Sequence, residues 1–285
     1  MKIVSSGKVL NSREFYKKKK RRKRIQLVFL SIGFLSVLSS LIYFSRQERF
    51  LVAEVMVLGE DVIDKEEIRG VAERLLRGYY FWIVPRANSF VYPRRTIERG
   101  LVEEFPRLKS ADLDLSEPNT LYITVDERLP FALYCANASN FVNTSLSAQA
   151  DKCYFLDEEG FIFALAPFFS GVTYFIYATE NQIENPIGKR FVMAEEFKLL
   201  TKFIENLGAL NIRSSALEFG DDEYNLFLSG GGQIKWRRGG DLTVIHSNLE
   251  AFLSDDSIQV QSNFLDKILY LDLRTENKVF YKFKD

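Results

Sequence analysis

An uncharged run of twenty residues, Ile25–Phe44, limits what this chain can fold into more than any other stretch. A helix of this length rises roughly 30 Å at about 1.5 Å per residue, which matches the hydrocarbon core of a bilayer. The eight residues before it, Lys17–Arg24, are all cations, whereas Arg46–Arg49 after it is nearly balanced. Because cytoplasmic flanks carry the excess of Lys and Arg, the run predicts a single-pass transmembrane helix with its N-terminus in the cytoplasm.

A cleaved signal peptide is the alternative interpretation of this run. Signal segments have about 7–15 apolar residues and end at a small-x-small cleavage site. The run here is longer, and the sequence at its end, LIYFSRQERF, contains no such site. We therefore expect Ile25–Phe44 to stay in the protein as its contact with the cytoplasmic membrane.

The basic segment in front of the helix, residues 1–24, holds eleven Lys and Arg and one acid, Glu14. Its net charge of +10 is balanced by −10 over the rest of the chain. Because it lacks apolar periodicity, this cytoplasmic tail is expected to be disordered. A basic block beside a membrane span is more often a topology signal attracted to anionic lipid than a nucleic-acid-binding arm, so we expect no nucleic-acid partner.

Two cysteines, Cys135 and Cys153, follow the predicted membrane helix, with seventeen residues between them. They can pair in a disulfide if the outer compartment is oxidising. Two free thiols at strand ends are the alternative, and the sequence leaves the choice open.

Residues 50–127 have the pattern of a small αβ domain. Alternating apolar residues end in a turn at Gly59, and Asp64 with Glu67 has the spacing of a helix capping box. Pro93 suits the first turn of a second helix, which Pro106 stops. The expected order is strand, helix, helix, strand, strand, with strands at 51–58, 108–115 and 121–125 and helices at 65–77 and 93–105.

Residues 128–285 are expected to form a strand-rich domain, which places the whole chain in the α+β class. Apolar segments of strand length follow one another from Phe131 onward. One or two helices interrupt them, an amphipathic one near Ala194–Leu207 and a short one near Ser247–Ser254.

The sequence offers no convincing catalytic or metal-binding set. His246 is the only histidine, and a zinc site would need further His or Cys residues at ligand spacing. The one Ser-x-x-Lys, at Ser5, falls in the cytoplasmic tail. Acidic clusters at Asp157, Asp221 and Asp255 lie at turns, where acids are favoured for solvation. We expect no enzymatic activity, no cofactor, no metal and no small-molecule substrate.

Five motifs, in their order along the chain, support a family resemblance. They are Val55–Gly59, the helix from Ile97 to Phe105 and Pro106, the segment Pro118–Pro130 with the sequence PNTLYITVDERLP, the hairpin Asp157–Gly160, and the segment Tyr270–Arg274 with the sequence YLDLR. Together with the basic tail, the single anchor and the expected order of elements, they resemble the bacterial cell-division family FtsQ/DivIB. The loop between the cysteines and the bulky stretch Tyr79–Tyr92 depart from the family pattern.

This resemblance implies both a fold and a function. Residues 50–127 would form a POTRA-type domain, and residues 128–285 a β-rich domain of the FtsQ type. The family is non-enzymatic: its members are scaffolds of the division complex, bind division proteins similar to FtsB and FtsL outside the cytoplasmic membrane, and help regulate septal cell-wall synthesis. We therefore expect the chain at the division septum.

The last strand, Asn277–Phe283, is the expected binding surface, because a strand at a sheet edge can pair with a strand of a partner. An edge strand protected by its own lysines is the alternative. The family motif before it adds residues to this surface. The expected partner-binding residues are Leu271, Asp272, Leu273, Arg274, Val279, Phe280, Tyr281 and Phe283.

Two other classes of protein compete with this interpretation. A POTRA-bearing adaptor of a secretion or envelope-assembly machine usually carries several such modules or a C-terminal barrel. A membrane-anchored wall hydrolase or transferase needs a nucleophile or metal set, for which the sequence gives no convincing candidate.

Overall fold

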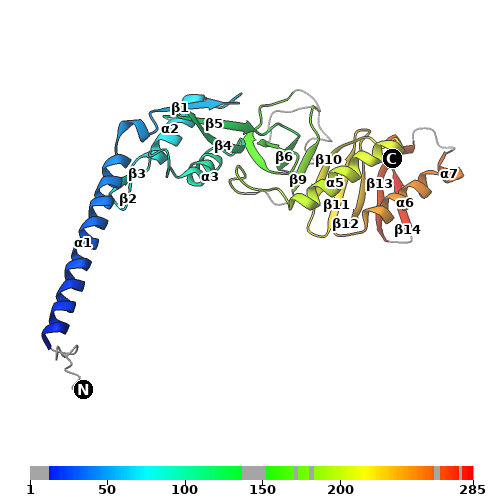
Figure 1. The fold of residues 1–285 in the computed structure, drawn as a ribbon. Coiled ribbons are helices and arrows are strands. Elements are labelled where there is room, and N and C mark those ends of the chain that lie inside the picture. The colour runs from blue at the N-terminus through cyan, green and yellow to red at the C-terminus, as the bar shows by residue number, and fades with distance from the viewer. Residues whose placement is uncertain are drawn as a thin grey trace, which may run out of the picture. The chain divides into compact units, whose positions relative to one another are not determined.

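The computed structural model of the chain describes residues 13–117, 119–136, 152–169, 173–179, 183–259, 264–275 and 278–284 (Figure 1). The first twelve residues of the predicted tail, Pro118 of the longest motif, Asn277 of the predicted last strand and most of the loop between the cysteines lie outside these residues. The chain forms two units. The first extends to Leu101 and includes Ala111–Val125, and the second comprises Val102–Ser110 and the chain from Asp126 onward.

The first helix, α1 (Arg13–Ser45), is 33 residues long. Among the described residues it is the one helix long and apolar enough to cross a membrane, over Tyr16–Ser45. The prediction of a disordered tail is wrong for Arg13–Arg24, because these residues continue the helix. Lys and Arg are good helix formers, and adding a residue to an existing helix avoids the cost of nucleation.

The rest of the first unit is a small sheet with two helices. The sheet has the order β1-β5-β4, and β1 runs parallel to β5 with Val55 opposite Leu121. The predicted order strand, helix, helix, strand, strand is present, with a 3-10 turn before it and a short hairpin between the helices. The elements are η1 (Glu48–Phe50), β1 (Glu54–Leu58), α2 (Lys65–Leu76), β2 (Tyr79–Tyr80), β3 (Val84–Pro85), α3 (Arg94–Glu104), β4 (Leu108–Glu117) and β5 (Thr120–Glu127). The end of α3, the start of β4 and the last two residues of β5 fall within the second unit.

Local sequence signals explain both helices of this unit. The Asp64 side chain caps α2 by accepting a hydrogen bond from the backbone N–H of Glu66 at 2.8 Å. Pro93 directly precedes α3. Each helix buries one apolar stripe, and the fully buried residues of these stripes include Ile68, Ile97 and Leu101.

The second unit is built on a nine-stranded sheet of order β14-β13-β12-β11-β10-β9-β6-β7-β8. Most neighbouring strands are antiparallel, but β6 with β9, β9 with β10, and β12 with β13 are parallel. The strands are β6 (Ala132–Ala136), β7 (Cys153–Leu156), β8 (Ile162–Leu165), β9 (Ile176–Thr179), β10 (Ser214–Phe219), β11 (Glu223–Leu228), β12 (Gly232–Arg237), β13 (Ile268–Thr275) and β14 (Lys278–Phe283).

Helices of the second unit pack on one face of this sheet. The main core joins Phe197 of α5, Leu249 of α6 and Phe264 of α8 to strand residues such as Trp236 and Leu271. A smaller apolar cluster lies on the opposite face of β6, β7 and β9. The helices are α5 (Ala194–Leu207), η2 (Gly208–Leu210), α6 (Leu242–Leu253), α7 (Asp256–Gln259) and α8 (Phe264–Lys267).

Helix α6 begins five residues before the predicted start at Ser247. The Asp241 side chain caps it by accepting hydrogen bonds from the backbone N–H groups of Thr243 and Val244. The predicted start was too late because the first turn, Leu242–Ile245, is uncharged and resembles a strand segment.

Candidate partner-binding edge of the C-terminal sheet

The predicted binding strand lies at an edge of the nine-stranded sheet. Within the described residues, β14 has a neighbour on one side only, β13, with Tyr281 opposite Leu271 and Phe280 opposite Asp272. Its other side therefore presents backbone N–H and C=O groups that the sheet does not use. A strand of another protein can form hydrogen bonds with these groups.

Two of the predicted partner-binding residues belong to the core. Leu271 is 0% exposed and Leu273 is 6% exposed, and both pack in the main cluster beneath the helices. Their side chains cannot reach a partner while the sheet is intact, so we remove them from the predicted surface. The motif that contains them is explained by packing, because alternate residues of a strand face the same side of a sheet.

Aromatic packing fixes the inner side of β14. The ring of Tyr281 lies 5.5 Å from Phe252, 5.7 Å from Phe264 and 5.5 Å from Phe283, measured between ring centroids. Val279 and Phe283 also pack against the main core. These three predicted residues hold the edge strand in place, and Tyr281 alone among them keeps a large exposed fraction, 42%.

The face of β13 and β14 that points away from the helices carries an exposed aromatic ring and an ion-pair network. Phe280 is 51% exposed. The Arg274 guanidinium donates hydrogen bonds to Asp272 on its own strand and, at 2.7 Å, to Glu223 on β11. Arg274 lowers the pKa of the Asp272 carboxyl, and the two carboxylates raise the pKa of the guanidinium. Phe280, Asp272 and Arg274 are thus the predicted residues that a partner beside β14 can contact on this face.

Lysines flank the open edge. Lys278 and Lys282 lie on β14 and are exposed. The Lys284 ammonium donates to the carbonyl oxygens of Gly230 and Asp266, both at 2.7 Å, and pins the end of the strand. Charged side chains also protect edge strands against pairing with other chains. The lysines are therefore equally consistent with the alternative that β14 is an edge strand protected from pairing.

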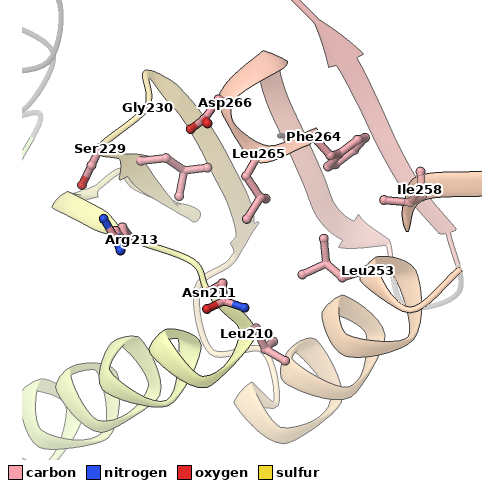
Figure 2. Close-up of a pocket in the computed structure, with 11 residues that line it drawn as sticks. Leu210, Asn211, Arg213, Ser229, Gly230, Leu253, Ile258, Phe264, Leu265 and Asp266 are labelled. Carbon is pink, nitrogen blue, oxygen red and sulfur yellow. The ribbon is translucent and has the colours of Figure 1, made fainter. Parts of the chain in front are cut away.

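A cavity of about 640 Å³ opens near the same end of the sheet (Figure 2). Leu210, Leu253 and Phe264 contribute apolar walls, and Arg213 and Asp266 are its charged lining residues. Across the described residues, no group of three His, Cys, Asp or Glu side chains is placed to hold a metal ion.

A buried ion pair that was not predicted from the sequence joins two of the five motifs. Arg128 donates to Asp157, and their side chains are 9% and 5% exposed. Asp157 also accepts backbone N–H bonds from Glu159 and Phe161, and the Arg128 guanidinium lies 4.1 Å from the centroid of the Phe161 ring. These motif residues therefore build the turn between β7 and β8.

The two cysteines lie directly opposite each other on neighbouring strands. Cys135 of β6 pairs with Cys153 of β7, and a disulfide joins them. Cys135 is 0% exposed. The bond closes the loop between these two strands.

Comparison with known proteins does not extend this description. No protein-family model matches the chain, and no curated protein matches it.

Proposed function

We propose that this protein is a non-enzymatic, membrane-anchored scaffold of the bacterial division complex, of the kind found in the FtsQ/DivIB family. The residues 50–127 serve as its POTRA-type domain, and the β-rich domain after them binds other division proteins outside the cytoplasmic membrane. Through these contacts it helps regulate septal cell-wall synthesis.

The free edge of β14 is the observation that carries the proposal. A partner strand that pairs with it gains main-chain hydrogen bonds along the strand, and side chains such as Phe280 set its register. The expected partners are division proteins similar to FtsB and FtsL, as the family resemblance implies.

The anchor supports the same function. A helix long enough to span the membrane, preceded by a basic segment, keeps the binding edge outside the cytoplasm and tethers it to that membrane. Partners that are themselves anchored in that membrane then meet the edge at a high effective concentration.

Site-specific photo-crosslinking in dividing cells tests this function. A photo-reactive phenylalanine analogue is placed at Phe280 on β14 or, as a matched control, at Leu165 on β8, the opposite edge strand. Leu165 is similarly exposed, at 55%. We expect position 280 to give crosslinks to a division protein and position 165 to give none.

A fluorescent fusion of the full chain separates the division scaffold from the competing adaptor of a secretion or envelope-assembly machine. A scaffold of the division complex gathers at midcell. Uniform fluorescence around the membrane of dividing cells, together with no crosslink at position 280, would contradict the proposed function.

A further inference from the structure

Two bulky aromatic side chains, Phe81 and Trp82, lie almost wholly in solvent at the tip of the hairpin β2–β3. Their exposed fractions are 93% and 92%. A scattered exposed apolar residue needs no explanation, but an adjacent, fully presented Phe-Trp pair marks a surface that something else covers.

The backbone of the tip is strained. Phe81 and Trp82 have φ values of 46° and 63°, and the N–H of Ile83 donates to the carbonyl of Tyr80 at 2.9 Å. Two successive positive φ values are typical of the type I′ turn, in which Asn-Gly is strongly preferred. A turn that uses Phe-Trp there forgoes stability, and strain of this kind is characteristic of functional segments.

Specific contacts fix this hairpin to the C-terminal end of α1 (Figure 1). The Arg46 side chain donates to the carbonyl of Ile83 at 3.1 Å. Asn88, which is 3% exposed, donates from its side chain to the carbonyl of Ser45 at 2.9 Å. The hairpin therefore lies where the apolar run of α1 ends.

The chemistry around the tip is that of a membrane interface. Tyr43 and Phe44 at the same end of α1 are 68% and 51% exposed. The guanidinium of Arg86 lies 5.7 Å from the centroid of the Tyr80 ring. Aromatic rings concentrate at the boundary between hydrocarbon and headgroups, and neighbouring arginines reach the lipid phosphates.

We propose that the β2–β3 tip inserts Phe81 and Trp82 into the outer-leaflet interface of the membrane that α1 spans. The occupant of this apolar surface is therefore lipid. Two contacts, one helix and one hairpin, then restrain how the first unit tilts and rotates against the bilayer. The inference rests on the membrane anchoring in the proposed function, and it concerns a surface that partner binding does not use.

Tryptophan fluorescence of the full chain in vesicles tests the insertion. The chain has two tryptophans, and the other, Trp236, is 0% exposed inside the second unit. The chain is reconstituted into phosphatidylcholine–phosphatidylglycerol vesicles, with or without lipids brominated near the headgroup end of their acyl chains. The difference between the wild type and W82F isolates the emission of Trp82.

We expect brominated lipid to remove most of the Trp82 emission and aqueous iodide to leave most of it. W82F keeps an aromatic ring at the tip, and its remaining emission, from Trp236, should be the same in both kinds of vesicle. If iodide quenches the Trp82 emission and brominated lipid does not, the proposal is wrong. The exposed tip would then be a surface for a protein partner.

Failure of the anchor gives a different result. If α1 does not span the membrane, alkaline carbonate releases both the wild type and W82F from the vesicles, whatever the quenching. A chain that resists carbonate but shows a water-exposed Trp82 contradicts the hairpin insertion alone.

Discussion

The buried ion pair of Arg128 and Asp157 determines the local structure at the start of the second unit. Arg128 also donates to the carbonyl of Pro106 at 3.2 Å, and its backbone N–H donates to the carbonyl of Arg107 at 2.8 Å. Each partner therefore has several hydrogen bonds that replace water. The pair is costly to break, because removing one member leaves the other charge buried and uncompensated.

The substitution Arg128→Ala is expected to lower the free energy of unfolding by about 3–5 kcal/mol. Urea unfolding of the full chain in detergent, followed by circular dichroism, measures the loss. Lys109→Ala is the matched control, since Lys109 forms an exposed ion pair with Glu158 at 2.9 Å and such pairs contribute about 0–1 kcal/mol. Equal effects of the two substitutions would contradict this role of Arg128.

The Asp272 carboxyl gives the candidate edge a dependence on pH. Its pKa is lowered in the folded protein, chiefly by the hydrogen bond from Arg274, so its contribution to stability is present at pH values above the unfolded pKa of about 3.9. That contribution falls as the pH drops through the folded pKa. We expect Asp272→Asn to destabilise the protein at pH 7 and to have a smaller effect as the pH is lowered below the unfolded pKa, as measured by urea unfolding over a series of pH values. A difference that stays constant with pH would contradict the lowered pKa.

At the scale of the element, one face of β14 packs on the helices, the opposite face is exposed, and the backbone along the strand's outer edge has no neighbouring strand among the described residues. The rings of Tyr281, Phe264 and Phe252 hold the strand on the helix layer, whereas Phe280 on the other side remains in solvent. An edge strand held this firmly is already in the conformation that a partner strand needs. Preorganisation of this kind lowers the entropy cost of binding.

The disulfide between β6 and β7 closes a loop whose ends are 18 residues apart in sequence. In the chain-entropy model a loop of this size contributes roughly 3 kcal/mol. Replacing Cys135 and Cys153 together with alanine is therefore expected to lower the melting temperature. Intact mass after alkylation without reductant checks the bond directly, and a mass gain for two alkylated thiols would contradict it.

At the scale of the whole molecule, α1 is the helix, among the described residues, that is long and apolar enough to cross a membrane. Its apolar part, Ile25–Phe44, is preceded by eight cations, and all of its described side chains between Tyr16 and Ser45 lie outside the core. The helix of Arg13–Ser45 rises about 50 Å, so it extends well beyond the roughly 30 Å of hydrocarbon. The excess length lies at the basic end, where lysine and arginine side chains can reach the headgroups.

The charge difference across this helix predicts its orientation in the membrane. Alkaline phosphatase fused behind Lys284 is expected to be active, because that enzyme needs the oxidising space outside the cytoplasmic membrane. Replacing Lys17–Arg24 with neutral residues should lower this activity by reducing the bias that orients the helix. High phosphatase activity that persists in this variant would show that the basic run does not set the orientation.

Much of the molecule followed from sequence alone, because its signals are local. The charge-free run predicted the part of α1 from Ile25 to Phe44. Apolar periodicity, the cap at Asp64 and the proline at position 93 predicted the order of the main strands and helices in residues 50–127. The helix Ala194–Leu207 has the predicted bounds. In each case the residues that define the element are close neighbours along the chain, so their spacing is sufficient evidence.

Burial, ion pairing and exposure depend on residues far apart in sequence, and only the tertiary structure decided them. The parallel pairing of β12 with β13 buries Leu271, so that a motif that resembled a binding surface became core. The ion pair between Arg128 and Asp157 forms across 29 residues. Trp82 is 92% exposed at the tip of a hairpin that Arg46 contacts through the carbonyl of Ile83, 37 residues later in the sequence. Burial, pairing and exposure are properties of the packed chain, and an apolar residue has the same letter whether it faces a core, a partner or a membrane.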